Sequence, residues 1–114
     1  MEFIRGDTQS FKFLITYKDK TIIKKEEIDT LFLTCKKSIY SNENIFQKTL
    51  EDVEFDEDGY VNVVFNPEDT ESLEYGKYVF DIEITTKAGY RKTKLFEFEL
   101  LGETTFHGGD LNGN

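Results

Sequence analysis

The sequence has one cysteine, one histidine, one proline and no tryptophan among its 114 residues. A single cysteine excludes an intrachain disulfide and any metal site built from several thiolates. Cys35 lies in the apolar stretch 31–35, so we expect a buried thiol. The lone histidine, His107, lies in a Gly-rich C-terminal stretch without a second histidine or a cysteine beside it. These scarcities predict a protein that is not an enzyme and has no catalytic, metal-binding or cofactor-binding residues.

Long apolar runs are also missing. No run reaches the roughly 18 residues that a membrane-spanning helix needs. The opening residues, Met1 to Arg5, lack an apolar core of signal-peptide length. We therefore expect a protein that is made in a cytoplasm and has no membrane partner.

Basic residues are in the minority. The chain has 14 Lys and Arg against 23 Asp and Glu, which gives a net charge of −9. Binding to a phosphate backbone depends on clustered Lys and Arg that release counterions, so direct nucleic-acid binding is not expected. An acidic surface favours solubility and also favours basic partners. The charge alone leaves both explanations open.

Aromatic residues are abundant, with 11 Phe and 6 Tyr. Together with branched residues they recur at every second position, as Tyr78, Phe80, Ile82 and Ile84 do, which is the period of a strand with one buried face. The expected strands are 2–5, 10–18, 28–37, 45–50, 53–55, 60–65, 78–85 and 96–100. This spacing predicts an all-β fold, a single antiparallel β-sandwich of seven or eight strands, with a closed barrel as the alternative. We expect the sandwich to span residues 1–102 and a flexible Gly-rich tail to span 103–114.

The stretch before the longest expected strand makes the sandwich more specific. Asn66 is a suitable cap for one helical turn, with Pro67 at its first position. Gly76 and Tyr78 then form a Gly-x-Tyr at the start of the strand, where immunoglobulin-like domains have a tyrosine corner. Since the chain has no cysteine pair and no Trp, an antibody-type domain is excluded. We predict an immunoglobulin-like sandwich in which these four residues are structural.

The run from Glu51 to Gly59 is acidic and ends in Asp-Gly, the signature of a tight hairpin turn. An EF-hand needs a bidentate glutamate at the twelfth loop position, but alignment on Gly59 places Phe65 there. The EF-hand interpretation therefore fails. Calcium binding by a looser site at residues 56–58 stays open beside the simpler view of a solvated turn.

Tyrosines offer one further kind of site, because carbohydrate-binding surfaces present exposed aromatic rings on a sheet face. The candidates are Tyr40, Tyr60, Tyr75 and Tyr90, of which Tyr60 and Tyr90 are the best placed to face a glycan. The alternative is that these rings pack against the domain or lie at strand ends.

Several motifs can be taken together: Phe3 to Thr8 followed by Phe11-Lys12-Phe13, Asn66 to Thr70 with Leu73, Gly76 to Glu83, and a turn at Gly89 before a last strand ending near Leu100. With these motifs the chain resembles a family of small bacteriophage and prophage structural domains. The family is typified by the N-terminal immunoglobulin-like domain of the baseplate upper protein in phages of Gram-positive hosts. The motifs cover most of residues 3–101, and all of them are turns and strand starts.

The resemblance implies a non-enzymatic phage or prophage structural or adaptor protein, associated with the virion, baseplate or tail. Such a protein is made in the bacterial host cytoplasm, and its partners are other virion proteins or further copies of itself. An edge strand such as 2–5 or the last strand would pair with a neighbouring subunit. The alternative is a soluble binding module, either carbohydrate-binding or an acidic inhibitor of a basic host protein.

Overall fold

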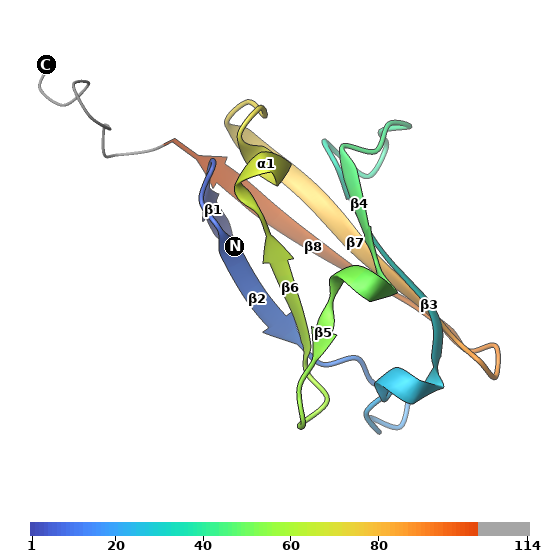
Figure 1. Ribbon diagram of the computed structural model, residues 1–114. Coiled ribbons are helices and arrows are strands. Elements are labelled where there is room, and N and C mark those ends of the chain that lie inside the picture. The colour runs from blue at the N-terminus through green and yellow to red at the C-terminus, as the bar shows by residue number, and fades with distance from the viewer. Residues whose placement is uncertain (103–114) are drawn as a thin grey trace, which may run out of the picture.

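Two β-sheets stacked on one another make up residues 1–102, the part of the chain that the computed structural model describes (Figure 1). One sheet has five strands in the order β1-β8-β7-β3-β4, and the other has three in the order β2-β6-β5. The strands are β1 (Glu2–Ile4), β2 (Gln9–Phe13), β3 (Ile28–Lys36), β4 (Phe46–Thr49), β5 (Glu54–Phe55), β6 (Val61–Phe65), β7 (Gly76–Thr86) and β8 (Arg91–Leu101). The helical segments are η1 (Lys25–Glu27), η2 (Leu50–Asp52) and α1 (Pro67–Thr70).

The hairpin of β7 and β8 is the longest feature of the fold and runs across the whole molecule (Figure 1). It is paired antiparallel without a break from Gly76 opposite Leu100 to Thr85 opposite Arg91. Along β7, every second side chain is buried, because the predicted alternation turns one face of the strand to the other sheet. Gly89 has φ of +94° in the connecting turn, a conformation that favours glycine.

The core between the sheets is built largely from phenylalanine. Phe65, at the end of β6, is fully buried and lies at the centre of this cluster. The centroid of its ring is 5.0–5.9 Å from the ring centroids of Phe3, Phe11, Phe46, Phe80 and Phe98. Since these rings come from β1, β2, β4, β7 and β8, one side chain joins both sheets and both edges of the larger one.

The predicted all-β sandwich of seven or eight strands is confirmed, and the number of strands is eight, with two local differences. β1 pairs with β8 in parallel, whereas an entirely antiparallel arrangement was expected. β2 ends at Phe13 rather than continuing to residue 18, because the chain turns back and the Ile23 N–H donates to the Ile15 carbonyl at 2.8 Å. The expected tail, 103–114, and His107 lie outside the described residues. Within residues 1–102, no helix is both long enough and apolar enough to cross a membrane.

The turn that leads into β7 is held by Tyr78. Its side chain is buried, and its hydroxyl donates a hydrogen bond of 2.6 Å to the backbone carbonyl of Glu74, four residues earlier. This is the geometry of the tyrosine corner that the Gly-x-Tyr pattern suggested. Burial also raises the pKa of the Tyr78 hydroxyl, so the neutral form that donates this bond persists in the folded protein.

Replacing Tyr78 by phenylalanine is expected to lower the free energy of unfolding by about 1–2 kcal/mol, because the Glu74 carbonyl loses its donor while the ring still packs. Urea denaturation followed by circular dichroism would measure the loss. Tyr60→Phe is the matched control, since within residues 1–102 the Tyr60 hydroxyl makes no hydrogen bond, and its effect should stay within about 0.5 kcal/mol. Equal effects of the two substitutions would show that the corner hydrogen bond does not stabilise the fold.

Candidate functional site

Two lysines of β8 lie on the face of the strand that points into the sandwich. Farther along, the same face carries the buried Phe98 and Leu100, so Lys92 and Lys94 continue an apolar row. In the β7–β8 register each lysine is opposite a buried isoleucine of β7. Two cations therefore stand where the alternation would place apolar side chains.

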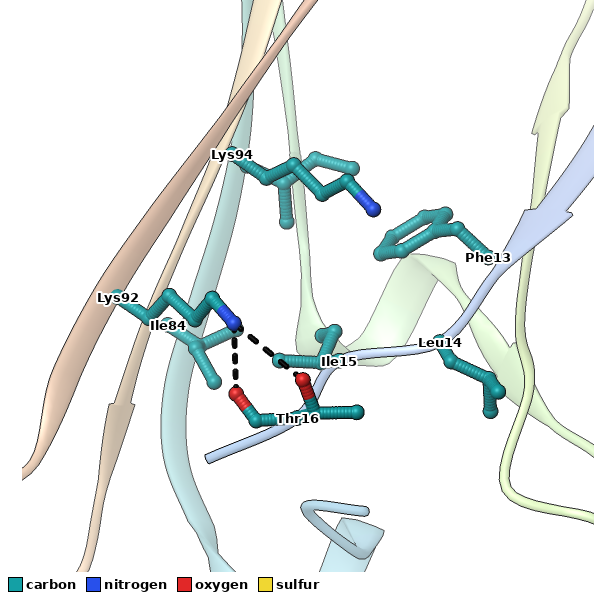
Figure 2. Close-up of a pocket in the computed structure, with 8 residues that line it drawn as sticks. Phe13, Leu14, Ile15, Thr16, Ile84, Lys92 and Lys94 are labelled. Carbon is teal, nitrogen blue, oxygen red and sulfur yellow. Dashed lines mark hydrogen bonds between the residues drawn. The ribbon is translucent and has the colours of Figure 1, made fainter. Parts of the chain in front are cut away.

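A cleft separates these lysines from the segment Phe13–Thr16, which begins at the last residue of β2 (Figure 2). Its volume is ≈ 170 Å³. The apolar part of its lining is Phe13, Leu14, Ile15, Ile82 and Ile84. All of these except Leu14 are buried, so the lysine stems border an apolar pocket.

The two ammonium groups are placed differently. Lys92 Nζ donates to the backbone carbonyl of Thr16 at 2.7 Å and lies 3.4 Å from the Thr16 hydroxyl, which fixes it at one end of the cleft (Figure 2). Lys94 reaches toward Phe13 and its Nζ is 5.5 Å from the ring centroid of Phe96 (Figure 2). One cation is therefore held by the backbone, and the other is more exposed at the opening.

Among the described residues, no acidic side chain lines this cleft. Across the described part of the chain, the one ion pair at salt-bridge distance is Lys48–Asp69, on the other side of the sandwich. The chain has an excess of nine negative charges, yet the cleft is positive. A partly exposed ion pair typically contributes about 0.2–1 kcal/mol after desolvation and screening, so a bound carboxylate would be modestly favoured here.

The size of the cleft limits what can enter it. A cavity of about 150 Å³ lined by apolar side chains holds one benzene molecule. Pockets for drug-sized ligands and cofactors usually measure about 300–1,000 Å³. At ≈ 170 Å³ the cleft suits one small ring or one side chain, rather than an organic cofactor.

The residues singled out for structural roles lie around α1 and the start of β7, away from the cleft. Asn66 precedes α1, but its side chain makes no capping hydrogen bond, so that part of the prediction was wrong; instead its N–H donates to the Asp69 carboxylate at 2.7 Å. Pro67 is the first residue of that turn. Gly76 opens β7 with φ of +133°, which accounts for glycine at this position.

The two tyrosines considered for glycan binding are not brought together into one platform by any ring contact within residues 1–102. Tyr60 lies beneath Lys12, whose Nζ is 4.8 Å from the ring centroid. Tyr90 packs on Tyr17 at 5.1 Å between ring centroids and is partly buried against the core. Both rings therefore have packing roles within the domain.

The acidic turn at residues 56–58 is organised by Asp56. Its carboxylate accepts hydrogen bonds from the N–H groups of Asp58 and Tyr60, at 2.9 and 3.0 Å. These bonds account for an aspartate at the tip of the β5–β6 hairpin. In residues 1–102, no group of three or more His, Cys, Asp and Glu side chains is arranged to hold a metal ion.

Cys35 is fully buried in β3. Desolvation raises the pKa of its thiol to about 12, with a smaller contribution from the charge of Asp69. The thiolate, which is the nucleophilic and metal-binding form, is therefore scarce at neutral pH.

Reasoning from the sequence missed the lysine cleft, because a lysine in a strand is normally assigned to the solvent-exposed face. The signal that could have found it is the period of the last strand. Counting back by two from Leu100 passes Phe98 and Phe96 and then reaches Lys94 and Lys92. Continued in this way, the alternation places both lysines on the inner face.

Comparison with known proteins finds similarity to solved structures. No protein-family model matches the sequence, and no curated protein matches it. Among solved structures, CopC from Methylosinus trichosporium OB3b is similar, with a TM-score of 0.51 over 93% of this chain and 87% of that chain, at 10% sequence identity. Likeness at this identity shows the fold alone, and it supports the immunoglobulin-like type of sandwich.

The predicted role as a phage structural or adaptor protein was wrong. The structural neighbour described above is CopC, one of two matching chains, and neither the family models nor the curated proteins contain a phage match for this chain. The physical reason is that the motifs behind the resemblance are turns and strand starts. Asn66 to Thr70 and Gly76 to Tyr78 form a capped turn and a tyrosine corner, which stabilise a sandwich whatever it binds.

Proposed function

We propose that this protein is a non-catalytic binding module whose site is the cleft between β8 and Phe13–Thr16. Its ligand carries a carboxylate for Lys92 and Lys94 and an apolar group no larger than one ring. The observation that carries the proposal is a pair of inward-facing ammonium groups beside an apolar pocket that no acidic side chain of residues 1–102 lines.

A purely structural explanation competes with this proposal. Inward-pointing lysines on a sheet edge can serve only to prevent edge-to-edge aggregation. That role needs charge but no cavity and no fixed ammonium. The cleft of ≈ 170 Å³ and the 2.7 Å bond from Lys92 to Thr16 support a binding site in addition to a protective role.

Benzoate is a suitable probe, because it has one ring and one carboxylate. Titration followed by NMR should shift the methyl signals of Ile15, Ile82 and Ile84 with saturation. With about nine non-hydrogen atoms at ~0.3–0.5 kcal/mol each, the expected Kd is roughly 0.5–10 mM. Neutral benzamide should bind at least about fivefold more weakly, since it lacks the charge that the lysines attract.

Substitution by methionine removes each charge and keeps an unbranched stem. The double variant Lys92→Met/Lys94→Met should lose benzoate binding, whereas Lys12→Met, which removes an exposed cation on neighbouring β2, should retain it. Absence of saturable shifts in the unsubstituted protein, or equal binding in the double variant, would leave the lysines with the protective role alone.

A further inference from the structure

The edge of β8 that faces away from β7 is only partly covered. β1 pairs with residues 99–101, where the Glu99 N–H donates to Met1 and the Leu101 carbonyl accepts from Arg5. Since backbone groups alternate in direction along a strand, those of 91, 93, 95 and 97 point to the same side. Within residues 1–102 no strand pairs with them there. Four N–H and four carbonyl groups are thus left on an open edge.

We propose that this open edge and the lysine cleft together bind an extended, acidic segment of another protein as an added strand beside β8. This inference rests on the proposed function of the cleft and names its ligand class. β1 already demonstrates that the edge accepts a strand over part of its length. The incoming segment would occupy the remainder, from Arg91 to Glu97.

Alternation of side chains joins the edge to the cleft. On an added strand every second side chain faces inward, on the side of the sheet where Lys92, Lys94 and Phe96 lie. The ≈ 170 Å³ beneath these positions accommodates one apolar side chain. The lysines favour Asp or Glu at the neighbouring inward positions, since cross-strand pairs of opposite charge are stabilising. The expected ligand therefore alternates acidic or aromatic inward residues with polar outward ones.

Pairing between two copies of this chain is the competing use of the open edge. If two β8 edges pair antiparallel so that all four open residues are used, Arg91 lies opposite Glu97 of the second copy at both ends, and Lys94 lies opposite the second Lys94 at the centre. The two end pairs attract, whereas the like charges at the centre repel. An acidic strand replaces that central repulsion by attraction, and light scattering distinguishes it from a dimer.

A defined peptide tests this inference. The probe is the acetylated, amidated heptapeptide TETFTET, with glutamates and phenylalanine at alternate positions, and its glutamine analogue TQTFTQT is the control. Isothermal titration calorimetry should give a Kd for the acidic peptide about tenfold or more below that of the glutamine analogue. Its affinity should fall with added salt, because the attraction is screened.

Backbone methylation tests strand pairing directly. In an antiparallel pair with β8, the outward threonines of the peptide direct their N–H groups to β8 and the inward residues direct theirs to solvent. N-methylation of two threonines should weaken binding at least about tenfold, while N-methylation of two inward residues should change it less than about threefold. If methylation of the threonines and methylation of the inward residues weaken binding equally, no antiparallel strand is formed. The same holds if neither methylation weakens binding. Either result overturns the inference.

A protein variant separates this inference from the proposed function. Leu95→Pro removes one N–H of the open edge and none of the N–H groups that pair with β7. Edge strands tolerate proline at such a position. With the fold verified by NMR, this variant should lose the peptide about tenfold and still bind benzoate. Lys92→Met/Lys94→Met should lose both ligands.

Two outcomes with these variants contradict the inference. Unchanged peptide affinity in Leu95→Pro would show that the peptide does not pair with β8 as a strand. Peptide binding that survives in the lysine variant would show that the cleft does not take part. Light scattering supplies a further check. Dimerisation of the protein on addition of the peptide, instead of a complex of one chain with one peptide, would also overturn the inference.

Discussion

Replacing Phe65 by alanine should lower the free energy of unfolding by about 3–5 kcal/mol, the usual cost of deleting a fully buried aromatic side chain. The expectation follows from the position of this ring, which is 0% exposed and contacts phenylalanines of five other strands. Removing it leaves a cavity that the surrounding rigid rings fill only in part. Urea denaturation would give the value directly, provided that the free energy of unfolding depends on urea concentration with the same slope in both proteins.

Phe32→Ala is the matched control, because it makes the same chemical change at an exposed site. Phe32 lies on the outer face of β3 and is 37% exposed. Its cost should stay below about 1.5 kcal/mol, since much of its surface is already in water. If Phe65→Ala fails to fold, Phe65→Leu, with an expected cost of about 1–2 kcal/mol, keeps the comparison measurable. Similar losses for Phe65 and Phe32 would mean that the aromatic cluster does not hold the two sheets together.

Much of the fold could be predicted from the sequence because it depends on local patterns. The alternation from Tyr78 to Ile84 fixes which face of β7 is buried, and Asp-Gly at 58–59 fixes a hairpin. Strand direction was less accessible. Residues 2–4 carry no information about whether their partner runs parallel or antiparallel, and their parallel pairing with β8 depends on how the whole chain folds around them.

The candidate site could not be predicted because it depends on charged residues at inward positions. A lysine in a strand is read as solvent-facing, and this rule misplaces Lys92, Lys94 and also Lys48. Whether an inward lysine is tolerated depends on what lies across the sandwich. Lys48 faces Asp69 and forms an ion pair, whereas Lys92 faces the carbonyl and hydroxyl of Thr16 and, in the part of the chain that the structure describes, no carboxylate. Those partners lie on other elements of the chain, so only the tertiary structure shows them.

The two sides of the sandwich therefore differ in a way that bears on function. On the side of β4, the Lys48–Asp69 pair at 2.9 Å joins the edge of the larger sheet to α1, which follows β6 of the smaller one. On the side of β8, the inward lysines meet no carboxylate within the described residues. One side is closed by the chain itself, and the other presents the same kind of cation to a cleft.

The closed side can be tested by Asp69→Asn, for which we expect a loss of about 3 kcal/mol in the free energy of unfolding. Lys48 is only 9% exposed, so the substitution leaves a buried ammonium without its counter-charge, which typically costs about 3–5 kcal/mol. The partial exposure of both side chains, 11% and 14%, favours the lower end of that range. Chemical denaturation at neutral pH and low salt is the measurement.

Asp52→Asn provides the control. Asp52 accepts the Thr49 N–H at 2.8 Å, just as Asp69 accepts the N–H of Asn66. Within the described residues, however, Asp52 has no lysine partner. Its expected cost is about 1 kcal/mol or less, the value of a cap alone. Adding Lys48→Met to Asp69→Asn should recover most of the loss, because the unpaired charge is then gone and the apolar stem is retained. Equal costs for Asp69→Asn and Asp52→Asn would mean that the lysine gains nothing from its carboxylate. The β4 side would then be closed by packing alone, and an inward lysine in this sandwich would need no anionic partner on either side.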